Sequence, residues 1–443
     1  MNSSKLRSIK EKDIRTYNLI RNSVFAIVSR GINLLVSLIS VPLLLNYMGV
    51  PSFGVYSIMI SVPSVVNFID LGMSLGLMNN VSNYITDTDP LKLRKATTAT
   101  FLISSIISIS LLLLFFLAFS FFDIKGIFGL TDHADFKGIN LMIGLFAIAY
   151  LIGAPFNMVN NFLIGNQQAY FVEIGKTAYS ILQLLLFLIA IHFKWSPYIF
   201  SVLYILSISL INLVIFFIVF FFLRKDISPS RRYIDTNEIR LVFKNSMKYF
   251  VLQLMTILFL SIDPMLIGKF LSTDSVTKYS IMFRVASILT LPVVMYSSQI
   301  LPLINDAIST KDNKWVKSNI RKILTVSTLY VFLLMFLLYF LGDWILSLWL
   351  KDSITFDRLN WLSVFILILL ISYNSIVSTI FLIPKLVKKN LYYFPASVIL
   401  TFALKILLFP RVGLDYTLII TYSLFLFIFC GKGVLVFRQF KLI

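Results

Sequence analysis

The sequence predicts an all-α integral membrane protein, with about twelve transmembrane helices in two six-helix lobes around a central cavity. Hydrophobic residues make up 58% of the 443 residues and charged residues only 13%, whereas a soluble domain carries roughly 25% charged residues. The hydrophobic residues also cluster, because Phe101–Phe122, Ser201–Leu223 and Val326–Leu341 contain no charge. A helix of about 20 apolar residues crosses roughly 30 Å of bilayer hydrocarbon. One such stretch could be a buried core helix, but a long series of them predicts a membrane protein.

The predicted spans follow one another along the whole chain. Residues 1–21 are polar and basic, which indicates a cytoplasmic N-terminal segment rather than a signal peptide. The first lobe, residues 22–223, has predicted helices at residues 22–47, 53–84, 96–122, 138–165, 169–191 and 197–223. The second lobe, residues 244–443, has predicted helices at residues 244–270, 275–306, 320–341, 357–383, 388–409 and 413–438. Several are longer than a bilayer requires, so we expect them to tilt or to extend past it.

The lysines and arginines indicate the orientation. With the N-terminus in the cytoplasm, most of the 39 Lys and Arg residues fall in cytoplasmic segments and few in outer loops. This bias predicts that both termini are cytoplasmic and that the number of spans is even. The most basic loop, residues 224–243, is predicted to be the cytoplasmic linker between the lobes. Topology and anionic lipid headgroups also account for the net charge of +19, so no nucleic acid partner is expected.

The two halves of the chain look related. Val41–Met59 aligns with Asp263–Met282, because each has a proline followed by an apolar triplet, then a loop, then Tyr-Ser-Ile-Met. A duplicated unit with an even number of helices inserts both copies the same way up. The sequence therefore predicts a parallel pseudo-two-fold axis along the membrane normal, an arrangement that allows alternating access.

Five ionisable residues lie within predicted spans: Arg30, Asp70, Asp263, Arg284 and Lys405. Such a residue costs at least about 2.5–3.5 kcal/mol on insertion scales, so each one is a candidate functional residue. Three cations against two anions favour an anionic substrate. Arginine suits phosphate because its guanidinium can donate two hydrogen bonds at once.

Arg30 shares one helical face with Ser23, Asn33, Ser37 and Ser40, at steps of three, four and seven residues. A polar stripe facing lipid is costly, so we expect it to face a watery cavity or a neighbouring helix. The alternative is that Arg30 lies near the cytoplasmic surface and its side chain snorkels there.

The remaining cations have the same two interpretations. Arg284 shares its face with Ser280 and Ser287, in a predicted helix that begins near the outer surface. Lys405 lies close to Arg411 in the next outer loop, so snorkelling is a serious alternative for it. The predicted substrate cavity is accordingly formed by these four residues: Arg30, Asn33, Arg284 and Lys405.

The two acidic residues are predicted to couple an ion or to pair at a helix break. Asp70 has Asn67 and Ser74 on its face and lies two residues before Gly72, so it could cap a break in the helix. It could instead pair with an arginine or carry a proton. Asp263 precedes Pro264 and occupies the place that Val41 holds in the first half, so the lobes differ here.

Polar side chains in the middle of both lobes are suited to sugar hydroxyls, although such residues also bind helices together. They are Asn157, Asn160, Asn161, Gln168, Asn374 and Ser378. Catalytic machinery is not visible, and no enzyme activity, metal or cofactor is expected. The single cysteine, Cys430, excludes an intramolecular disulfide. The two histidines, His133 and His192, are expected to be ordinary loop residues.

Three short motifs follow one another in the first half: Met48-Gly49, Phe53-Gly54-Val55-Tyr56 and Asp70-Leu71-Gly72. In this pattern the chain resembles the polysaccharide-transport branch of the multidrug/oligosaccharidyl-lipid/polysaccharide exporter superfamily. Asn161–Tyr170 is similar to that family's Gly-x-Gln segment after helix 4, and Ser261–Leu289 looks like its helix 7–8 hairpin. Asp70 matches the family's Asp-Leu-Gly and Arg30 a basic position in helix 1, whereas Lys405 matches no family position.

Within this branch the chain looks most like an O-antigen or capsular polysaccharide repeat-unit flippase. The resemblance implies transport of an undecaprenyl-pyrophosphate-linked oligosaccharide to the periplasmic face of the bacterial cytoplasmic (inner) membrane, for lipopolysaccharide or capsule synthesis. It also implies antiport driven by an H+ or Na+ gradient. Membrane lipids and other polysaccharide assembly proteins are further candidate partners.

Two other functions remain open from the sequence. A multidrug or cation antiporter of the same superfamily would share the architecture, but should favour acidic or aromatic residues in its cavity. A membrane-embedded polysaccharide polymerase would act on the same lipid-linked glycan, but should have long catalytic outer loops. The longest connector here has no such cluster.

Overall fold

The computed structural model describes residues 3–66, 77–78, 81, 90–121, 139–240, 242–243, 254–255, 257–309, 313–351, 353–381 and 387–431. Over these residues the regular structure is helical throughout, and no strand occurs among them. Nine of the described helices are long and apolar enough to cross a membrane. The chain is therefore an all-α, multi-pass membrane protein. The number of twelve helices, the pseudo-two-fold axis and the cytoplasmic termini stay predictions.

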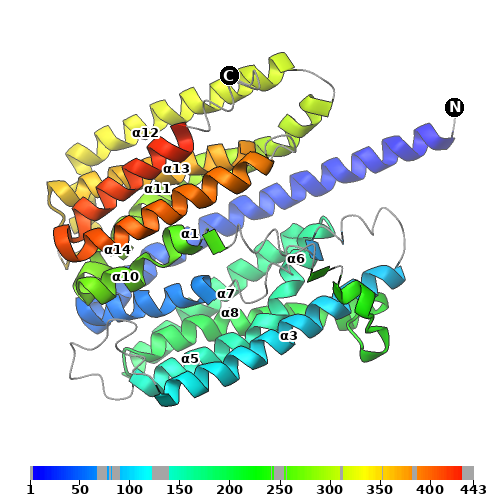
Figure 1. The fold of residues 1–443 in the computed structure, drawn as a ribbon, viewed down its shortest axis with the longest axis horizontal. Helices are drawn as coiled ribbons and strands as arrows, with labels where there is room; N and C mark the ends of the chain where they lie inside the picture. The colour runs from blue at the N-terminus through cyan, green and yellow to red at the C-terminus, as the bar shows by residue number, and fades with distance from the viewer. Residues whose placement is uncertain are drawn as a thin grey trace. The chain divides into compact units, whose positions relative to one another are not determined.

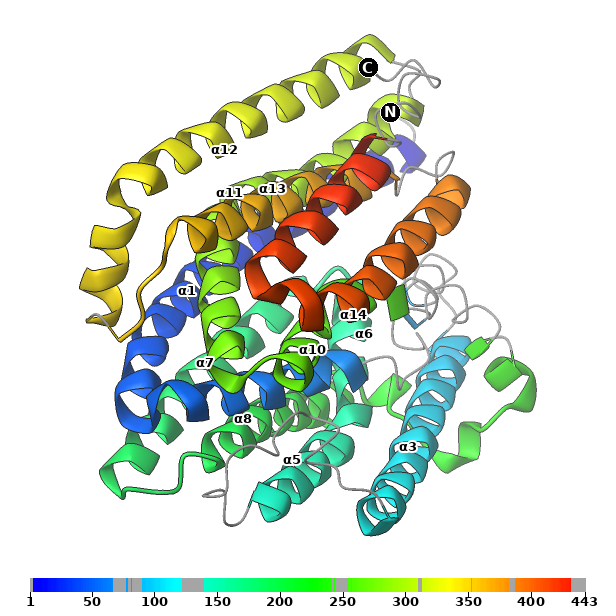
Figure 2. The same cartoon turned by 60° about the vertical axis from the view of Figure 1, so that its left-hand side comes forward.

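Two of these spans are interrupted by a glycine in a left-handed conformation. In α1 (Ser3–Val66) the break lies at Gly49, with φ 77°, and in α14 (Val387–Phe425) at Gly413, with φ 79°. Only glycine adopts this backbone region readily, so each glycine allows two helices to meet without a loop. Gly49 lies in the predicted gap between helices 22–47 and 53–84, whereas Gly413 is the first residue of the predicted helix 413–438. Beyond its break, α14 folds back along itself (Figure 2).

The chain forms two compact units. Unit 1 comprises Met1–Tyr47, Val62–Lys125 and His133–Leu254, and unit 2 comprises Met48–Ser61, Gly126–Asp132 and Met255–Ile443. The lobe boundaries expected from the sequence, at the basic linker 224–243, stay a prediction. Segment Met48–Ser61 comes from the first half of the chain but belongs to unit 2, and it contains the Phe-Gly-x-Tyr motif.

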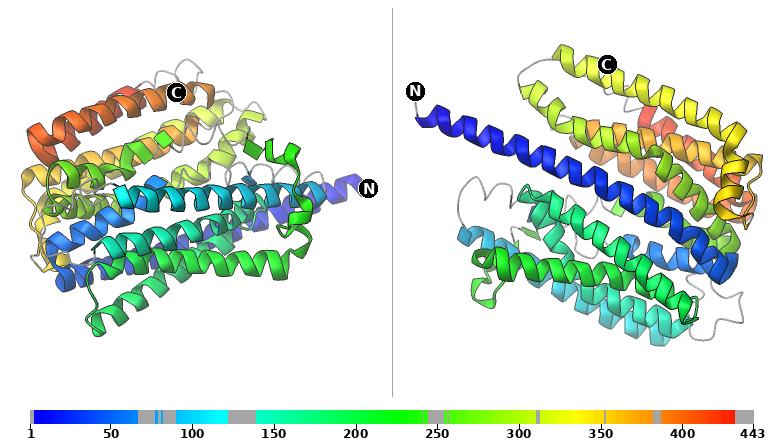
Figure 3. Two further views of the ribbon diagram at one scale, coloured as in Figure 1. Left: turned by 60° about the horizontal axis from the view of Figure 1, so that its bottom comes forward. Right: turned by 180° about the vertical axis from the view of Figure 1, so that it is seen from behind.

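Unit 1 contains helices that lie side by side with a short, structured connector (Figure 3). Its elements after α1 are α3 (Pro90–Phe121), α5 (Ile139–Gly153), η2 (Ala154–Asn157), α6 (Met158–Gly165), α7 (Ala169–His192), α8 (Ile199–Phe217), η3 (Ile218–Leu223), η4 (Lys225–Ile227) and η5 (Arg231–Tyr233). One buried cluster joins α3, α6 and η3 through Ala96, Phe162 and Phe220. Ile227 of the connector is also fully buried in this cluster, so the connector packs against the helices.

Unit 2 contains the longest helices of the second half (Figure 1). Its elements are η6 (Ile257–Ser261), α10 (Asp263–Phe270), α11 (Thr273–Ser309), α12 (Asn313–Leu350), α13 (Arg358–Phe381), α14 and η7 (Leu426–Cys430). Helix α13 packs on α11 and α14. At one end of α13, Asp415 of α14 accepts hydrogen bonds from Asn360 at 2.9 Å and Ser363 at 2.6 Å, which joins the two helices.

Helix α12 lies at the edge of unit 2 (Figures 2 and 3). One face carries large apolar side chains that are more than half exposed, including Leu329 at 66%, Phe336 at 62% and Phe340 at 66%. In a soluble protein such a face would be an aggregation hazard. In a membrane it is the surface that contacts lipid chains.

Candidate functional site

An ion pair lies in the interior of unit 2. Asp263 is the first residue of α10, and Lys405 lies in the middle of α14. The Nζ atom of Lys405 donates a hydrogen bond to Oδ1 of Asp263 at 2.7 Å, and both side chains are completely buried. The alternative that Lys405 snorkels to the outer surface is wrong, because its ammonium is enclosed by protein.

A π-helical turn interrupts the α-helical hydrogen bonding next to the ion pair. Residues Ile257–Ser261 form a π-helical turn just before α10, and such turns are frequent at functional sites. The carbonyl oxygen of Phe259 in this turn accepts a second hydrogen bond from Lys405, at 2.7 Å. Pro264 follows Asp263 at the start of α10, where a missing N–H costs nothing. The Asp263 carboxylate therefore lies at a helix N-terminus, which favours negative charge.

Two tyrosines complete the hydrogen bonding of the carboxylate. Tyr279 of α11 donates its hydroxyl to Oδ2 of Asp263 at 3.1 Å, and Tyr422 of α14 donates to the same oxygen. The two hydroxyl oxygens lie 3.3 Å apart. Asp263 thus accepts hydrogen bonds from three side chains on two other helices. A buried ion pair is tolerated only when its remaining hydrogen-bonding capacity is filled in this way.

Aromatic rings enclose the ammonium. The Nζ atom of Lys405 lies 4.6 Å from the ring centre of Tyr422 and 5.6 Å from that of Phe259. Phe425 stacks on Phe259 with ring centres 3.9 Å apart. The rings offer the cation their negative faces and separate the pair from water. In a low-dielectric pocket of this kind, a change in the charge of either partner is felt strongly by the other.

The predicted polar stripe of the first helix has a different environment. In unit 1, Arg30 is half-buried in α1, and within the described part of the chain it has no hydrogen-bond or ion-pair partner. Its neighbours bind another helix, because Ser29 donates to the carbonyl oxygen of Glu173 in α7 at 3.0 Å. Asn33 in turn donates to the hydroxyl of Ser29 at 3.4 Å. The contact with α7 is thus made by Ser29, which lies beside the predicted stripe, and the Arg30 guanidinium makes no hydrogen bond or ion pair among the described residues.

The sequence interpretation did not include Glu173. This residue is almost fully buried in α7, and its Oε1 accepts a hydrogen bond from Lys176 at 2.6 Å. Its other oxygen, Oε2, is buried without a hydrogen-bond partner. Opposite charges three residues apart inside the predicted span 169–191 are the signal that identifies such a pair. Glu173 is thus a second buried carboxylate, located in unit 1.

The asparagines suggested as a sugar-binding lining bind helices together. Asn212 of α8 accepts a hydrogen bond from Asn160 at 3.1 Å and donates to Asn157. Asn212 is buried, so this amide cluster joins α8 to η2 and α6. In unit 2, Ser378 donates to Asn374 one turn earlier in α13, at 3.2 Å.

The other predicted residues are distributed over both units. Arg284 is half-buried in α11 of unit 2. Asp70, together with its neighbours Asn67 and Ser74, lies outside the described residues. The structure therefore brings Asp263 and Lys405 together, and leaves Arg30 and Asn33 in unit 1. Among the described residues, no group of three or more His, Cys, Asp or Glu could hold a metal ion.

Two glycines of the sequence motifs mark close approaches between helices. A Cβ atom on Gly54 would lie 2.0 Å from the carbonyl oxygen of Thr273 at the start of α11. The contact is completed by Thr277, which donates its hydroxyl to the carbonyl of Val50 at 2.7 Å. A Cβ on Gly165 would lie 2.5 Å from the carbonyl of Met78. Any larger residue would push these backbones apart.

Comparisons with known proteins agree with this architecture. The sequence profile of the polysaccharide biosynthesis protein family matches residues 19–308, which is more than half of the chain. No curated protein matches the chain by sequence.

Solved structures show the fold. A multidrug resistance MATE family transporter of the MOP superfamily, in an inward-facing conformation, is similar with a TM-score of 0.69 at 14% identity, covering 94% of this chain and 97% of the other. A MOP superfamily transporter from Pyrococcus furiosus, whose binding pocket is described as having reverse polarity, gives a TM-score of 0.62 at 14% identity, covering 96% and 95%. The chain has the fold of these transporters.

Proposed function

The chain belongs to the polysaccharide biosynthesis protein family, and from this premise we propose that it is a flippase for undecaprenyl-pyrophosphate-linked oligosaccharide repeat units. It moves O-antigen, capsular or similar units across the bacterial cytoplasmic membrane, with both termini in the cytoplasm. The family match carries the proposal, because it connects a transporter fold with polysaccharide synthesis. Family and fold are those of transporters rather than enzymes.

The substrate chemistry is supported by the half-buried arginines. Arg30 of α1 and Arg284 of α11 lie in membrane-spanning helices. A charged side chain is costly there, so each is a candidate for a functional or structural role. In this proposal they bind the pyrophosphate, whose oxygens match the two-pronged donor geometry of arginine. The glycan occupies the aqueous space, near Asn33 for example, and the polyprenyl chain stays in lipid.

Coupling to the ion gradient is assigned to the carboxylates. Lys405 already supplies Asp263 with a counter-charge, so a sodium ion would have to displace an ammonium that is held by two hydrogen bonds. A proton needs no such coordination shell, and its binding to Asp263 would remove the attraction that holds Lys405 in place. We therefore assign H+ as the coupling ion and the Asp263–Lys405 pair as the element that changes between states. Asp70, in the first half of the chain, is a further candidate.

The first experiment is complementation. In a flippase-deficient strain, the wild-type chain should restore surface glycan, and its loss should cause single lipid-linked repeat units to accumulate on the cytoplasmic leaflet. Accumulation on the outer leaflet would instead indicate the polymerase. Arg30→Gln and Arg284→Gln should each reduce export at equal protein level, by about tenfold or more, because a charged hydrogen bond contributes about 1.5–3 kcal/mol. Arg232→Gln, on the exposed connector, is the matched control. Full export by both cavity variants would refute the cationic site.

A second candidate function is drug or cation antiport. The observation that favours it is the structural likeness to a multidrug resistance transporter. It predicts that expression confers drug resistance on a sensitive strain, with no effect on surface glycan. Drug resistance without restored surface glycan would support the antiporter function and contradict the flippase function.

A further inference from the structure

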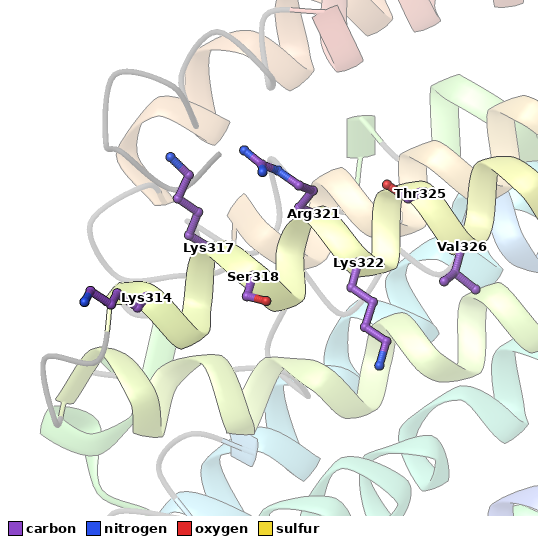
Figure 4. Close-up of a pocket in the computed structure, with 7 residues that line it drawn as sticks. All are labelled: Lys314, Lys317, Ser318, Arg321, Lys322, Thr325 and Val326. Carbon is purple, nitrogen blue, oxygen red and sulfur yellow. The ribbon is translucent and has the colours of Figure 1, made fainter.

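The start of α12 carries a cluster of basic residues around a hollow in the surface of unit 2. The cavity has a volume of about 600 Å³ and is lined by Lys314, Lys317, Ser318, Arg321, Lys322, Thr325 and Val326. Figure 4 shows Lys317 and Arg321 on one side of the helix, and Lys322 and Val326 on the other. Four of the seven lining residues are cations, and none is acidic.

These cations differ from two basic residues of unit 1. There, Lys95 of α3 pairs with Asp235 at 2.9 Å and Arg224 pairs with Asp226 at 3.0 Å, so each of these two cations has a carboxylate partner in the connector. Within the described residues, Lys314, Lys317, Arg321 and Lys322 have no carboxylate partner. A concentrated positive charge without an internal counter-charge is complementary to an anionic ligand.

An apolar stripe continues from the cluster along the same helix. Steps of four and three residues lead from Lys322 to Val326, Leu329, Leu333 and Phe336, so these side chains share a face. The four apolar side chains are 55%, 66%, 55% and 62% exposed. The charged cluster thus lies at the end of an exposed apolar stripe. A surface of this kind can bind both the charged headgroup and the apolar chain of an amphiphile.

We propose that the start of α12 is a binding site for an anionic phospholipid of the cytoplasmic leaflet. Its phosphate lies among Lys317, Arg321 and Lys322, and an acyl chain follows the stripe from Val326 towards Phe336. The predicted orientation places this end of α12 at the cytoplasmic surface, where anionic lipids attract basic side chains. The described lining offers only two hydroxyls, Ser318 and Thr325, so it favours a bulk phospholipid over a lipid-linked glycan, which needs many polar partners for its sugars.

Native mass spectrometry of the full-length protein tests the site. The protein is equilibrated in detergent with phosphatidylglycerol or with phosphatidylcholine, and retained lipid is counted. The wild-type chain should retain phosphatidylglycerol preferentially. The variant Lys317→Gln/Arg321→Gln should bind it about thirtyfold more weakly, since each basic residue near an anionic lipid contributes about 1 kcal/mol. The matched control is Arg231→Gln/Arg232→Gln, which removes the same charge from the exposed connector and should bind as the wild type does.

Four outcomes would overturn the proposal. Equal retention of both lipids, or equal weakening in both double variants, would mean that only general electrostatics operates. Displacement of phosphatidylglycerol by an equal concentration of inorganic phosphate would identify a site for soluble anions that makes no use of the apolar stripe. Retention of a lipid-linked diphosphate glycan in place of phosphatidylglycerol would identify a binding site for the transported substrate. Melting temperatures in phosphatidylcholine, expected to be equal for all variants, show that the chain remains folded.

Discussion

Two charged sites, one in each unit, have opposite environments. In unit 2, Asp263 and Lys405 are completely buried, and each is hydrogen-bonded to several partners from other elements. In unit 1, Arg30 is half-buried and has no partner among the described residues, while Glu173 lies between these extremes. The same sequence signal, one charged residue in an apolar span, thus marks either a buried ion pair or a charged side chain without a partner among the described residues. What differs is whether a complementary charge on a neighbouring helix lies within reach.

The largest effect on folding is expected from removing one member of the buried pair. Asp263→Asn leaves the ammonium of Lys405 buried without its counter-charge, which should cost about 3–5 kcal/mol. The double variant Asp263→Asn/Lys405→Met removes both charges and should recover most of this loss. Thermal unfolding in detergent measures both. If the double variant were as unstable as the single one, the pair would not be the unit that matters for stability.

A smaller effect is expected at Glu173. The carboxylate is buried, but the side chain of Lys176 is 44% exposed and can turn to water once its partner is lost. Glu173→Gln should therefore cost about 1 kcal/mol or less, as for other solvent-screened pairs. The same unfolding assay compares it with Asp263→Asn. If Glu173→Gln cost as much stability as Asp263→Asn, the exposure of Lys176 would not explain the difference between the two ion pairs.

The connector of unit 1 gives a pH-dependent test. Hydrogen bonds from the side chain of Lys95 and the backbone N–H of Asn237 lower the pKa of Asp235, whose side chain is 28% exposed. A lowered pKa stabilises the fold above the unfolded value of about 3.9, and this contribution is lost as the pH falls through the folded value. The difference in melting temperature between the wild type and Asp235→Asn should be small above pH 5 and vanish in strong acid. A difference in melting temperature that stays unchanged in strong acid would contradict this expectation.

The smallest effect on folding is expected at Arg30, although its effect on transport should be large. Because the guanidinium has no partner in the described residues, Arg30→Gln should change stability by no more than about 0.5 kcal/mol. Melting temperature and export are measured on the same preparation. A large loss of stability would mean that Arg30, like Lys405, contributes to folding and not only to transport.

The sequence predicts the fold well because apolar length and charge asymmetry are local properties. Twenty uncharged residues specify a span wherever they occur, and Gly49 and Gly413 mark the breaks. The ionisable residues within spans are visible for the same reason, and Asp263 and Lys405 were both identifiable as candidates.

Their pairing could not be predicted, because it depends on which helices are neighbours. Asp263 and Lys405 are 142 positions apart, and no periodicity connects them. The proximity of Lys405 to Arg411 suggested a shallow position, whereas packing of α14 on α10 buries it. Asn157 and Asn160 illustrate the same limit, since only the structure reveals Asn212 as their common partner. The Gly54 contact likewise requires knowledge that Thr273 lies opposite.

The separation of Asp263 from Lys405 also has a consequence for how the protein is made. Ribosomes add about 5–20 residues per second, so the 142 positions between the two residues correspond to roughly 7–28 s of synthesis. During this time the helix that carries Asp263 enters the membrane before its counter-charge exists, and a lone acidic residue there costs about 2.5–3.5 kcal/mol. Nascent chains that stop before α14 keep this defect permanently. The pair can therefore close only after α14 has been made, and until then the carboxylate of Asp263 has no counter-charge from this chain's second partner helix.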